Sequence, residues 1–288
     1  MKTRIVIIDA SPLLYRSYYG GNKNLRASTG MKTGAMFGFL RSYIALQKRF
    51  PQAYFLTVFD GIGVSGRREL YSEYKPLTDK NKAILRQMKH VRMFLEYAGL
   101  PTLYDEALEA DDFISIASHM WCDRHPLYNT IIVSSDRDFF QLLTHRVMQY
   151  DGRKEEFYGP KEVQEILGVP PEHVVWYKCY LGDTADNIPG MPGIGKKKAV
   201  ELAHLGPFGV TGSLSLDFMR NQRLITLPKS FAGLECLDKR TQKKHNLTVE
   251  NWFTHMEEGG HHVHEKAQQL LNFYEIKSFI PEDFHRGK

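Results

Sequence analysis

The sequence has 288 residues, of which 42% are hydrophobic and 25% charged, a composition that suits one large globular domain or two closely packed ones and excludes a disordered, collagen-like or coiled-coil chain. Its net charge of +5 permits nucleic-acid binding but fits a basic surface without that role equally well. The cysteines, Cys122, Cys179 and Cys236, form no C-x-x-C pair, which argues against structural zinc and a disulfide framework.

Three short apolar runs predict strands that are buried on both faces. They cover residues 5–8, 54–59 and 130–133. After the first run, Ser11 and Pro12 are typical of an N-cap followed by the first turn of a helix. The first run stops at Asp9, too early for a signal peptide, and no apolar stretch approaches the length of a membrane span. We therefore expect a cytoplasmic protein without a membrane segment.

Helical patterns lie between these strands, at residues 34–50, 81–98 and 109–121. Alternating strands and helices predict an α/β fold, a mostly parallel sheet with helices on both faces. Right-handed crossovers then place the carboxyl ends of the strands at one edge of the sheet, where open α/β sheets bind their ligands.

The pattern changes after Asp151. Residues 160–167 and 171–180 each begin with proline and predict helices, and a boundary is expected near Gly159. We thus expect an α/β domain over residues 1–159 and a helical region over residues 160–288, whose last eighty residues carry weak signals.

Nine acidic residues fall where one edge of the sheet could gather them. Helix-dipole or turn chemistry explains each one alone, but Asp9, Asp60 and Asp136 all terminate buried strands. So many carboxylates in one cleft repel one another, and divalent cations such as Mg²⁺ or Mn²⁺ would relieve the repulsion. Two ions about 4 Å apart could contact both the attacking and the leaving oxygen of a phosphodiester. The nine are Asp9, Asp60, Glu109, Asp111, Asp112, Asp136, Asp138, Asp183 and Asp186.

Glycines and lysines gather at residues 182–198, before a helical pattern at 199–205. Gly193 and Gly195 let backbone N–H groups approach a phosphate, and the next helix N-terminus is positive. The segment is not a Walker A loop, and no strand is expected to lead into it, which excludes a dinucleotide-binding fingerprint. A hairpin that grips nucleic-acid backbone and a glycine-rich turn with solvated lysines remain equally good interpretations.

Taken together, six motifs in this order resemble the 5′→3′ exonucleases and flap endonucleases of phages and bacteria, including the 5′-nuclease domain of bacterial DNA polymerase I. The resemblance covers residues 5–205 and implies a PIN/FEN-like fold with a helical arch at about residues 61–82 and a helix-three-turn-helix, a helix-hairpin-helix-type motif, at about 182–205. The motifs are V-I-I-D-A-S (6–11), V-F-D-G (58–61), R-R-E-L-Y-S-E-Y-K (67–75), L-E-A-D-D (108–112), S-S-D-R-D-F (134–139) and G-D-T-A-D-N-I-P-G-M-P-G-I-G-K-K-K-A (182–199).

The resemblance implies two metal sites that hold two or more Mg²⁺ or Mn²⁺ ions. The first would use Asp9, Asp60, Glu109, Asp111 and Asp112, and the second Asp136, Asp138, Asp183 and Asp186. Since all nine positions are acidic, an active enzyme is favoured. Lys75 and Arg16 would contact the scissile phosphate and join Asp9, Asp60 and Asp111 as catalytic residues.

The resemblance also implies DNA contacts. In the arch, Tyr74 would stack on a base and Arg67 and Arg68 would contact the strand, although Pro76-Leu77-Thr78 departs from the basic residues that follow in many relatives. In the hairpin, Gly193, Gly195, Lys196, Lys197 and Lys198 would hold the duplex. Some relatives bind K⁺ there through main-chain carbonyls, which correspond to Tyr180, Leu181, Pro189, Met191 and Ile194.

The expected function is that of a structure-specific 5′ nuclease of DNA replication or repair. Its substrates would be DNA with 5′ flaps, 5′ ends or single-strand/duplex junctions, with RNA primer strands as further candidates. We expect a monomer in the cytoplasm of a bacterium, or of the host cell of a phage. Two alternatives remain open: a non-catalytic DNA-binding protein on the same scaffold, and a Mg²⁺-dependent phosphatase of another α/β fold. The phosphatase commonly needs D-x-D after the first strand, where this chain has Asp9-Ala10-Ser11.

Overall fold

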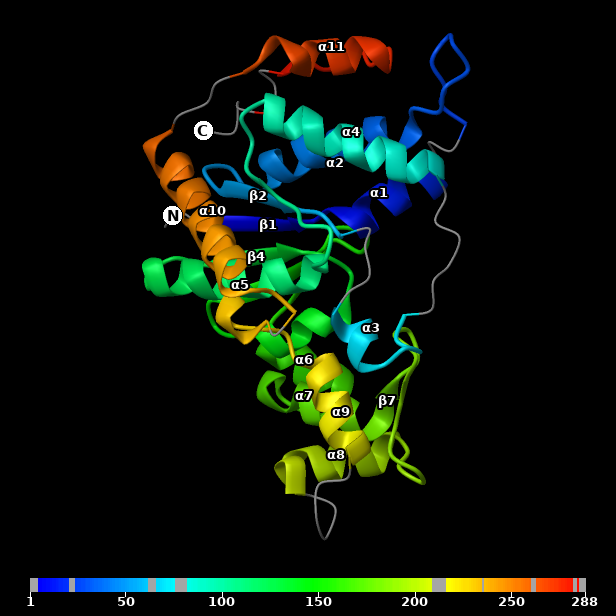
Figure 1. Ribbon diagram of the computed structural model, residues 1–288, viewed down its shortest axis with the longest axis vertical. Coiled ribbons are helices and arrows are strands. Elements are labelled where there is room, and N and C mark those ends of the chain that lie inside the picture. Colours follow the sequence, from blue (N-terminus) through cyan, green and yellow to red (C-terminus); the bar gives the residue numbers. More distant parts are fainter. Residues whose placement is uncertain are drawn as a thin grey trace.

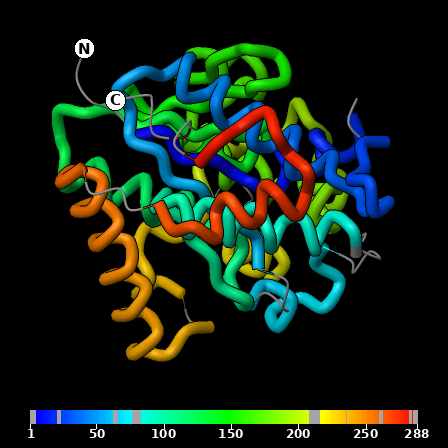
Figure 2. The backbone as a smooth tube through the Cα atoms, turned by 90° about the horizontal axis from the view of Figure 1, so that it is seen from above, coloured from blue at the N-terminus to red at the C-terminus, as the bar shows by residue number. Residues whose placement is uncertain are grey.

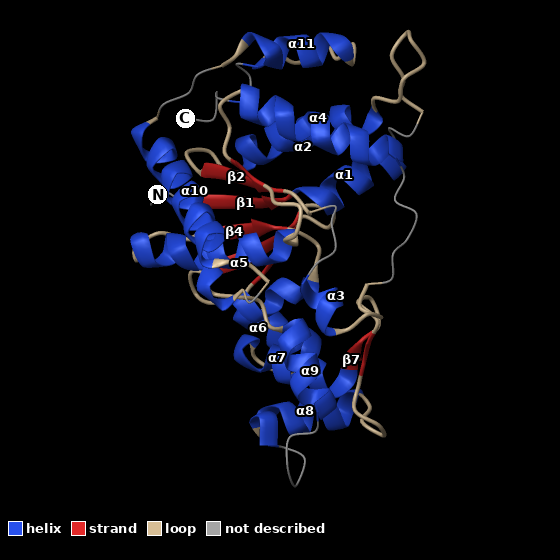
Figure 3. Ribbon diagram, viewed as in Figure 1, coloured by secondary structure: helices blue, strands red, loops and turns tan. Residues whose placement is uncertain are grey.

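The computed structural model describes residues 5–20, 24–61, 66–75, 82–208, 216–234, 236–259, 263–281 and 284. These residues form a six-stranded sheet in the order β3-β2-β1-β4-β5-β6 (Figures 1 and 3). The strands are parallel except β6, which runs antiparallel to β5 at the edge. They are β1 (Ile5–Asp9), β2 (Tyr54–Val58), β3 (Thr102–Leu103), β4 (Thr130–Val133), β5 (Val147–Asp151) and β6 (Glu156–Tyr158).

Strand β1 lies in the centre of the sheet, and all five of its residues are buried. Because strand side chains alternate between faces, Val6 and Ile8 enter one hydrophobic core, whereas Ile5 and Ile7 enter the other. Its register places Asp9 opposite Val58 of β2, and Ile8 opposite Val133 of β4. The carboxyl ends of these three strands therefore lie side by side, as the sequence predicts.

One face of the sheet is covered by α1 (Ala10–Tyr19), α2 (Gly34–Arg49), α4 (Lys82–Tyr97) and α11 (Glu265–Phe273). The other face is covered by α5 (Ala110–Arg124), with α10 (Lys239–Glu258) packed on it through Trp121 and Phe253. Figure 2 shows α11, in red, lying along α4. The predicted helices at 34–50, 81–98 and 109–121 are thus confirmed to within a few residues.

The helical region beyond Gly159 begins as expected with α6 (Pro160–Leu167), followed by the 3-10 turn η2 (Pro171–His173) and α7 (Val174–Leu181). It continues with β7 (Gly182–Asp183), β8 (Ile188–Pro189), α8 (Lys196–His204), η3 (Gly206–Phe208), α9 (Leu216–Ile225) and η4 (Phe231–Gly233). Helices α10 and α11 then return to the sheet and pack on α5 and α4. The two predicted parts of the chain therefore share their hydrophobic cores.

Two local predictions are wrong. Ser11 is not an N-cap, because β1 runs directly into α1 at Ala10 and Asp9 takes the N-cap position without a side-chain bond. A strand does lead into the glycine-rich part that begins at Gly190, since β8 lies directly before it and pairs with β7 in an antiparallel hairpin. This pair is separate from the main sheet, so the dinucleotide-binding motif stays excluded.

Residues 62–65 and 76–81 of the predicted arch lie outside the described residues. Between them the described part consists of α3 (Gly66–Leu70) and the segment 71–75. Among the helices that the structure describes, none has the length and apolar character needed to cross a membrane.

Candidate active site

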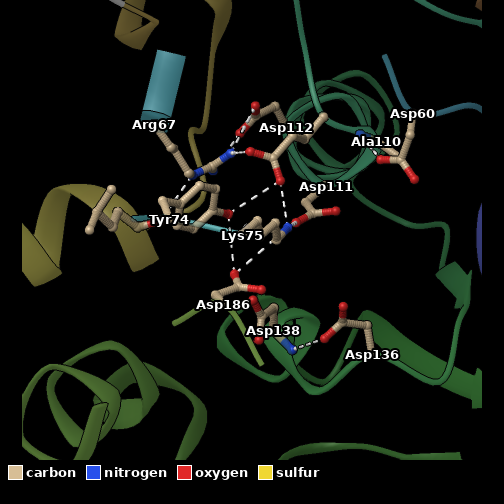
Figure 4. A network of polar contacts seen from close by, with 12 residues as sticks. Asp60, Arg67, Tyr74, Lys75, Ala110, Asp111, Asp112, Asp136, Asp138 and Asp186 are labelled. Carbon is tan, nitrogen blue, oxygen red and sulfur yellow. Dashed lines mark hydrogen bonds and ion pairs between the residues drawn. The ribbon is translucent and has the colours of Figure 1, made fainter. Parts of the chain in front are cut away.

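The carboxyl edge of the sheet carries acidic side chains from neighbouring elements (Figure 4). Asp9 is the last residue of β1, and Asp60 lies just beyond β2. Asp60 Oδ1 accepts a hydrogen bond of 2.9 Å from the Ala110 N–H, which joins the end of β2 to the start of α5. Asp111 lies in the first turn of α5, and Asp136 caps the 3-10 helix η1 (Arg137–Leu142) beyond β4.

Asp9 is buried, Asp60 and Asp111 are half-buried and Asp136 is exposed, and the four acids interact electrostatically. Burial, reinforced by the charges of Asp60 and Asp136, raises the pKa of Asp9 well above its ordinary value, although the Ser134 hydroxyl donates to Asp9 Oδ2 at 2.8 Å. Burial also raises the pKa of Asp111, against the opposing charge of Lys75. A site that disfavours ionised carboxylates in this way is stabilised by added positive charge.

Lys75 supplies one positive charge. Its Nζ lies 2.5 Å from Glu109 Oε2, 3.8 Å from Asp111 Oδ2 and 3.7 Å from Asp186 Oδ2, and Figure 4 shows Lys75 between Asp111 and Asp186. The backbone of Lys75 is left-handed, with φ of +40°, which is uncommon outside glycine. Its N–H donates to the Asp186 carbonyl at 3.0 Å, so the docked segment, and not local preference, holds the lysine there.

Arg67 was expected to contact DNA, and the structure corrects this prediction. Its guanidinium makes two bonds to Asp112, of 3.2 and 2.7 Å, and one of 3.1 Å to Glu109. Its Nε donates to the Leu224 carbonyl at 2.9 Å, and only 11% of its side chain is exposed. Both oxygens of Asp112 contact Arg67, which also joins Asp112 to Glu109 through a shared nitrogen, so the structure assigns Asp112 to this ion pair.

Tyr74 and Arg68 also differ from the predicted DNA contacts. The Tyr74 ring is 2% exposed and belongs to the hydrophobic core, so it cannot stack on a base in this arrangement. Its hydroxyl lies 3.2 Å from Glu109 Oε2 and 3.1 Å from Asp186 Oδ2. Arg68 donates to the carbonyls of Ser72 and Lys75. Both residues therefore brace the segment that carries Lys75.

The second predicted group contains a lysine that the sequence analysis missed. Lys178 of α7 contacts Asp138, and its Nζ lies 2.7 Å from Asp183 Oδ2. Asp138 is held in turn because its N–H donates to Asp136 Oδ1 at 2.9 Å. A charged residue inside the apolar run V-V-W-Y-K-C-Y-L, five residues before Asp183, was the available signal.

The acidic groups fit hard, oxygen-ligated cations, since thiols and imidazoles take no part in these contacts. As they stand, however, the described residues include no three acidic, histidine or cysteine side chains close enough together to hold a metal ion. The ammonium groups of Lys75 and Lys178 lie between the carboxylates instead. The two predicted metal sites therefore remain a prediction.

The glycine-lysine segment forms the expected hairpin between α7 and α8. Gly182 and Gly190 cross so closely that a Cβ on Gly190 would lie 2.2 Å from the Leu181 carbonyl oxygen, which explains the glycine. Gly193, with φ of +74°, precedes α8, and Lys196, Lys197 and Lys198 are exposed in its first turn. This surface is open to a phosphate backbone.

The main-chain carbonyls predicted for K⁺ lie around this hairpin. The carbonyls of Tyr180 and Met191 accept bonds from the N–H groups of Met191 and Ile194, and the Pro189 carbonyl accepts one from Asn221 at 2.7 Å. Three of the predicted carbonyls thus have protein donors already, and the K⁺ site stays a prediction.

Arg16 projects from α1 into a pocket of 530 Å³ that also reaches Asp9 and Ser134. Arg49 and Arg153, which the sequence analysis did not single out, line the same pocket. Arg16 and Asp9 therefore line the same pocket, which Lys75 does not line.

The comparisons with known proteins agree with this geometry. The family of 5′-3′ exonuclease N-terminal resolvase-like domains matches residues 4–168. A 5′-3′ exonuclease of Aquifex aeolicus is 30% identical over 224 residues, which are 77% of this chain and 75% of the relative. A DNA polymerase I of Pseudomonas aeruginosa is 33% identical over 226 residues, which are 78% of this chain but only 24% of that much longer protein.

Solved structures share the fold. A structure of the T5 5′-exonuclease with bound divalent zinc ions has a TM-score of 0.68 at 22% identity and covers 88% of this chain and 99% of that one. The catalytic core of Rad2 in complex with DNA substrate has a TM-score of 0.51 at 17% identity and covers 99% of this chain and 91% of that one. Together with the acidic edge and the hairpin, these matches establish that the chain belongs to the 5′→3′ exonuclease family.

Proposed function

We propose that this protein is a structure-specific 5′ nuclease that hydrolyses DNA phosphodiesters with the help of divalent Mg²⁺ or Mn²⁺. The observation that carries the proposal is the group of carboxylates gathered at the carboxyl edge of the sheet, in which burial and neighbouring charges raise the pKa values of Asp9 and Asp111. Such a group is stabilised by cations and lies where open α/β sheets bind ligands.

Asp9, Asp60, Glu109 and Asp111 would hold the first ion, and Asp136, Asp138, Asp183 and Asp186 the second. A divalent ion bound there supplies the positive charge that polarises a phosphodiester and lowers the pKa of water. Lys75, which contacts Glu109, and Arg16, which lines the pocket that reaches Asp9, would place positive charge beside the scissile phosphate. No protein nucleophile is needed.

The hairpin and α8 would hold the duplex beside this edge. Lys196, Lys197 and Lys198 are exposed at the N-terminus of α8, where backbone N–H groups also favour phosphates. Substrates would be DNA with 5′ flaps, 5′ ends or junctions, and RNA primer strands. Structures of the T5 5′-exonuclease contain metal ions, and the Rad2 catalytic core has been solved with DNA substrate, which supports the same chemistry for this chain.

Cleavage of a 5′-labelled flap duplex tests the proposal. The wild type should cut only with Mg²⁺ or Mn²⁺ and leave a 5′-phosphate on the product. Asp111→Asn should lower the single-turnover rate by about a thousandfold or more, because one ligand and one charge of the site are lost. Asp217→Asn, a surface acid on α9, is the matched control and should cut like the wild type.

Retained flap binding without cleavage by the wild type would instead identify a non-catalytic DNA-binding protein. Release of free phosphate from a small ester would indicate a phosphatase. Repeating the assay in KCl and in NaCl tests the K⁺ prediction, since a K⁺-specific hairpin should bind the duplex more tightly in KCl.

A further inference from the structure

Lys178 is a buried cation in the middle of an apolar helix. It lies on α7 between the buried Tyr177 and Cys179, and only 13% of its side chain is exposed. Burying an ammonium group is costly unless paired carboxylates compensate it. Its Nζ contacts Asp138 Oδ1 and lies 2.7 Å from Asp183 Oδ2. Two carboxylates therefore compensate the ammonium group.

Its two partners come from different parts of the chain. Asp138 lies in η1 beyond β4, whereas Asp183 lies in β7, directly after α7 ends. The ammonium group therefore joins the sheet edge to the hairpin.

These two partners are also the acids expected to hold the second divalent ion. In the structure the single positive charge of Lys178 bridges them. The ion pair between Arg67 and Asp112 is different. There the guanidinium bonds both oxygens of the same carboxylate. Lys178 contacts one oxygen of each acid, Asp138 Oδ1 and Asp183 Oδ2.

We propose that Lys178 is a tethered cation at the second metal position, so that a divalent ion binds Asp138 and Asp183 only by displacing its ammonium group. The proposal rests on the metal-dependent function proposed above. Competition of this kind weakens the binding of the second ion without altering the residues that hold it. It makes Lys178 a positioning residue that keeps the two acids together when the second ion is not bound.

Binding of Mn²⁺ in the absence of DNA tests the proposal. Free Mn²⁺ is followed by electron paramagnetic resonance as the wild type, Lys178→Met and Lys161→Met are titrated. Lys161 is an exposed lysine of α6 and serves as the matched control. In Lys178→Met the more weakly bound class of Mn²⁺ ions should bind at least about tenfold more tightly. This corresponds to roughly 1.4 kcal/mol of binding free energy that displacing the ammonium group costs in the wild type. Lys161→Met should match the wild type.

Thermal unfolding gives a second readout. Without divalent ions Lys178→Met should unfold at a lower temperature than the wild type, because two buried carboxylates lose their shared partner. Saturating Mn²⁺ should then raise its unfolding temperature by more than that of the wild type. If Lys178→Met folds poorly, Lys178→Gln is used, and a failure of Mn²⁺ to restore folding in both variants overturns the proposal.

The proposal would also be overturned if a folded Lys178→Met bound Mn²⁺ with unchanged affinity, or if it lost the more weakly bound class of Mn²⁺ ions. If the wild type binds no Mn²⁺ at all, the metal-dependent function fails instead, so the two failures are distinguishable.

Discussion

Two lysines bridge carboxylates in this protein, and they are held in different ways. Lys75 is 37% exposed, has a left-handed backbone and is kept in place by a bond to the Asp186 carbonyl. Lys178 is 13% exposed and projects from the regular helix α7. The position of Lys75 thus depends on the docking of segment 71–75, whereas the position of Lys178 follows from its own helix. We therefore expect contacts with DNA to rearrange the carboxylates around Lys75, and a bound metal ion to rearrange those around Lys178.

The largest expected effect concerns Lys75. Lys75→Met should lower the single-turnover rate of flap cleavage by about a hundredfold to a thousandfold, because one charge that stabilises the transition state is lost. The dissociation constant for the flap should change little. Lys89→Met on α4 is the control. An unchanged rate in Lys75→Met would mean that Lys75 only balances charge, as Lys178 does.

A substitution of Arg67 tests whether the carboxylates around Lys75 depend on the segment 66–75 that supports them. Arg67→Met leaves Asp112, which is 4% exposed, without its partner, so the free energy of unfolding in urea should fall by about 3 kcal/mol. Arg68→Met removes only two backbone contacts and should cost less than about 1 kcal/mol. Equal losses in the two variants would contradict the central place of the Arg67–Asp112 pair.

Asp186, which faces Lys75, and Asp183, which faces Lys178, should make stability respond to pH with opposite signs. Burial raises the pKa of Asp186 to about 6, so the folded protein binds its proton more tightly than the unfolded chain, and stability should fall as pH rises from about 4 to 6. Lys178 lowers the pKa of Asp183, so its contribution is present above the unfolded value and is lost only as pH falls below it.

Thermal unfolding in EDTA between pH 4 and 7 measures this difference. Asp186→Asn should remove part of the decline between pH 4 and 6, roughly 1–2 kcal/mol. Asp183→Asn should leave that decline in place and lower stability at pH 7. A decline of the same size in the wild type and Asp186→Asn would show that other acids dominate.

Local sequence predicted much of the fold. The runs that form β1, β2 and β4 are apolar and β-branched, and the helix patterns for α2, α4 and α5 are long and regular, so their periodicity was sufficient. Strand β3 has two residues, and β7 and β8 likewise, too few for any pattern to appear. Helices α9 and α10 were missed because each combines many polar residues with a few buried ones.

By itself, the sequence determined where the acids fall. Asp9 and Asp60 had to meet because each follows a buried strand and parallel strands share one carboxyl edge. Tertiary structure alone decided which charge each acid faces. Arg67 reaches Asp112 across 45 residues, and Lys75 reaches Asp186 through a segment docked on the hairpin. Such partners depend on how distant segments pack, and neither periodicity nor spacing along the chain carries that information.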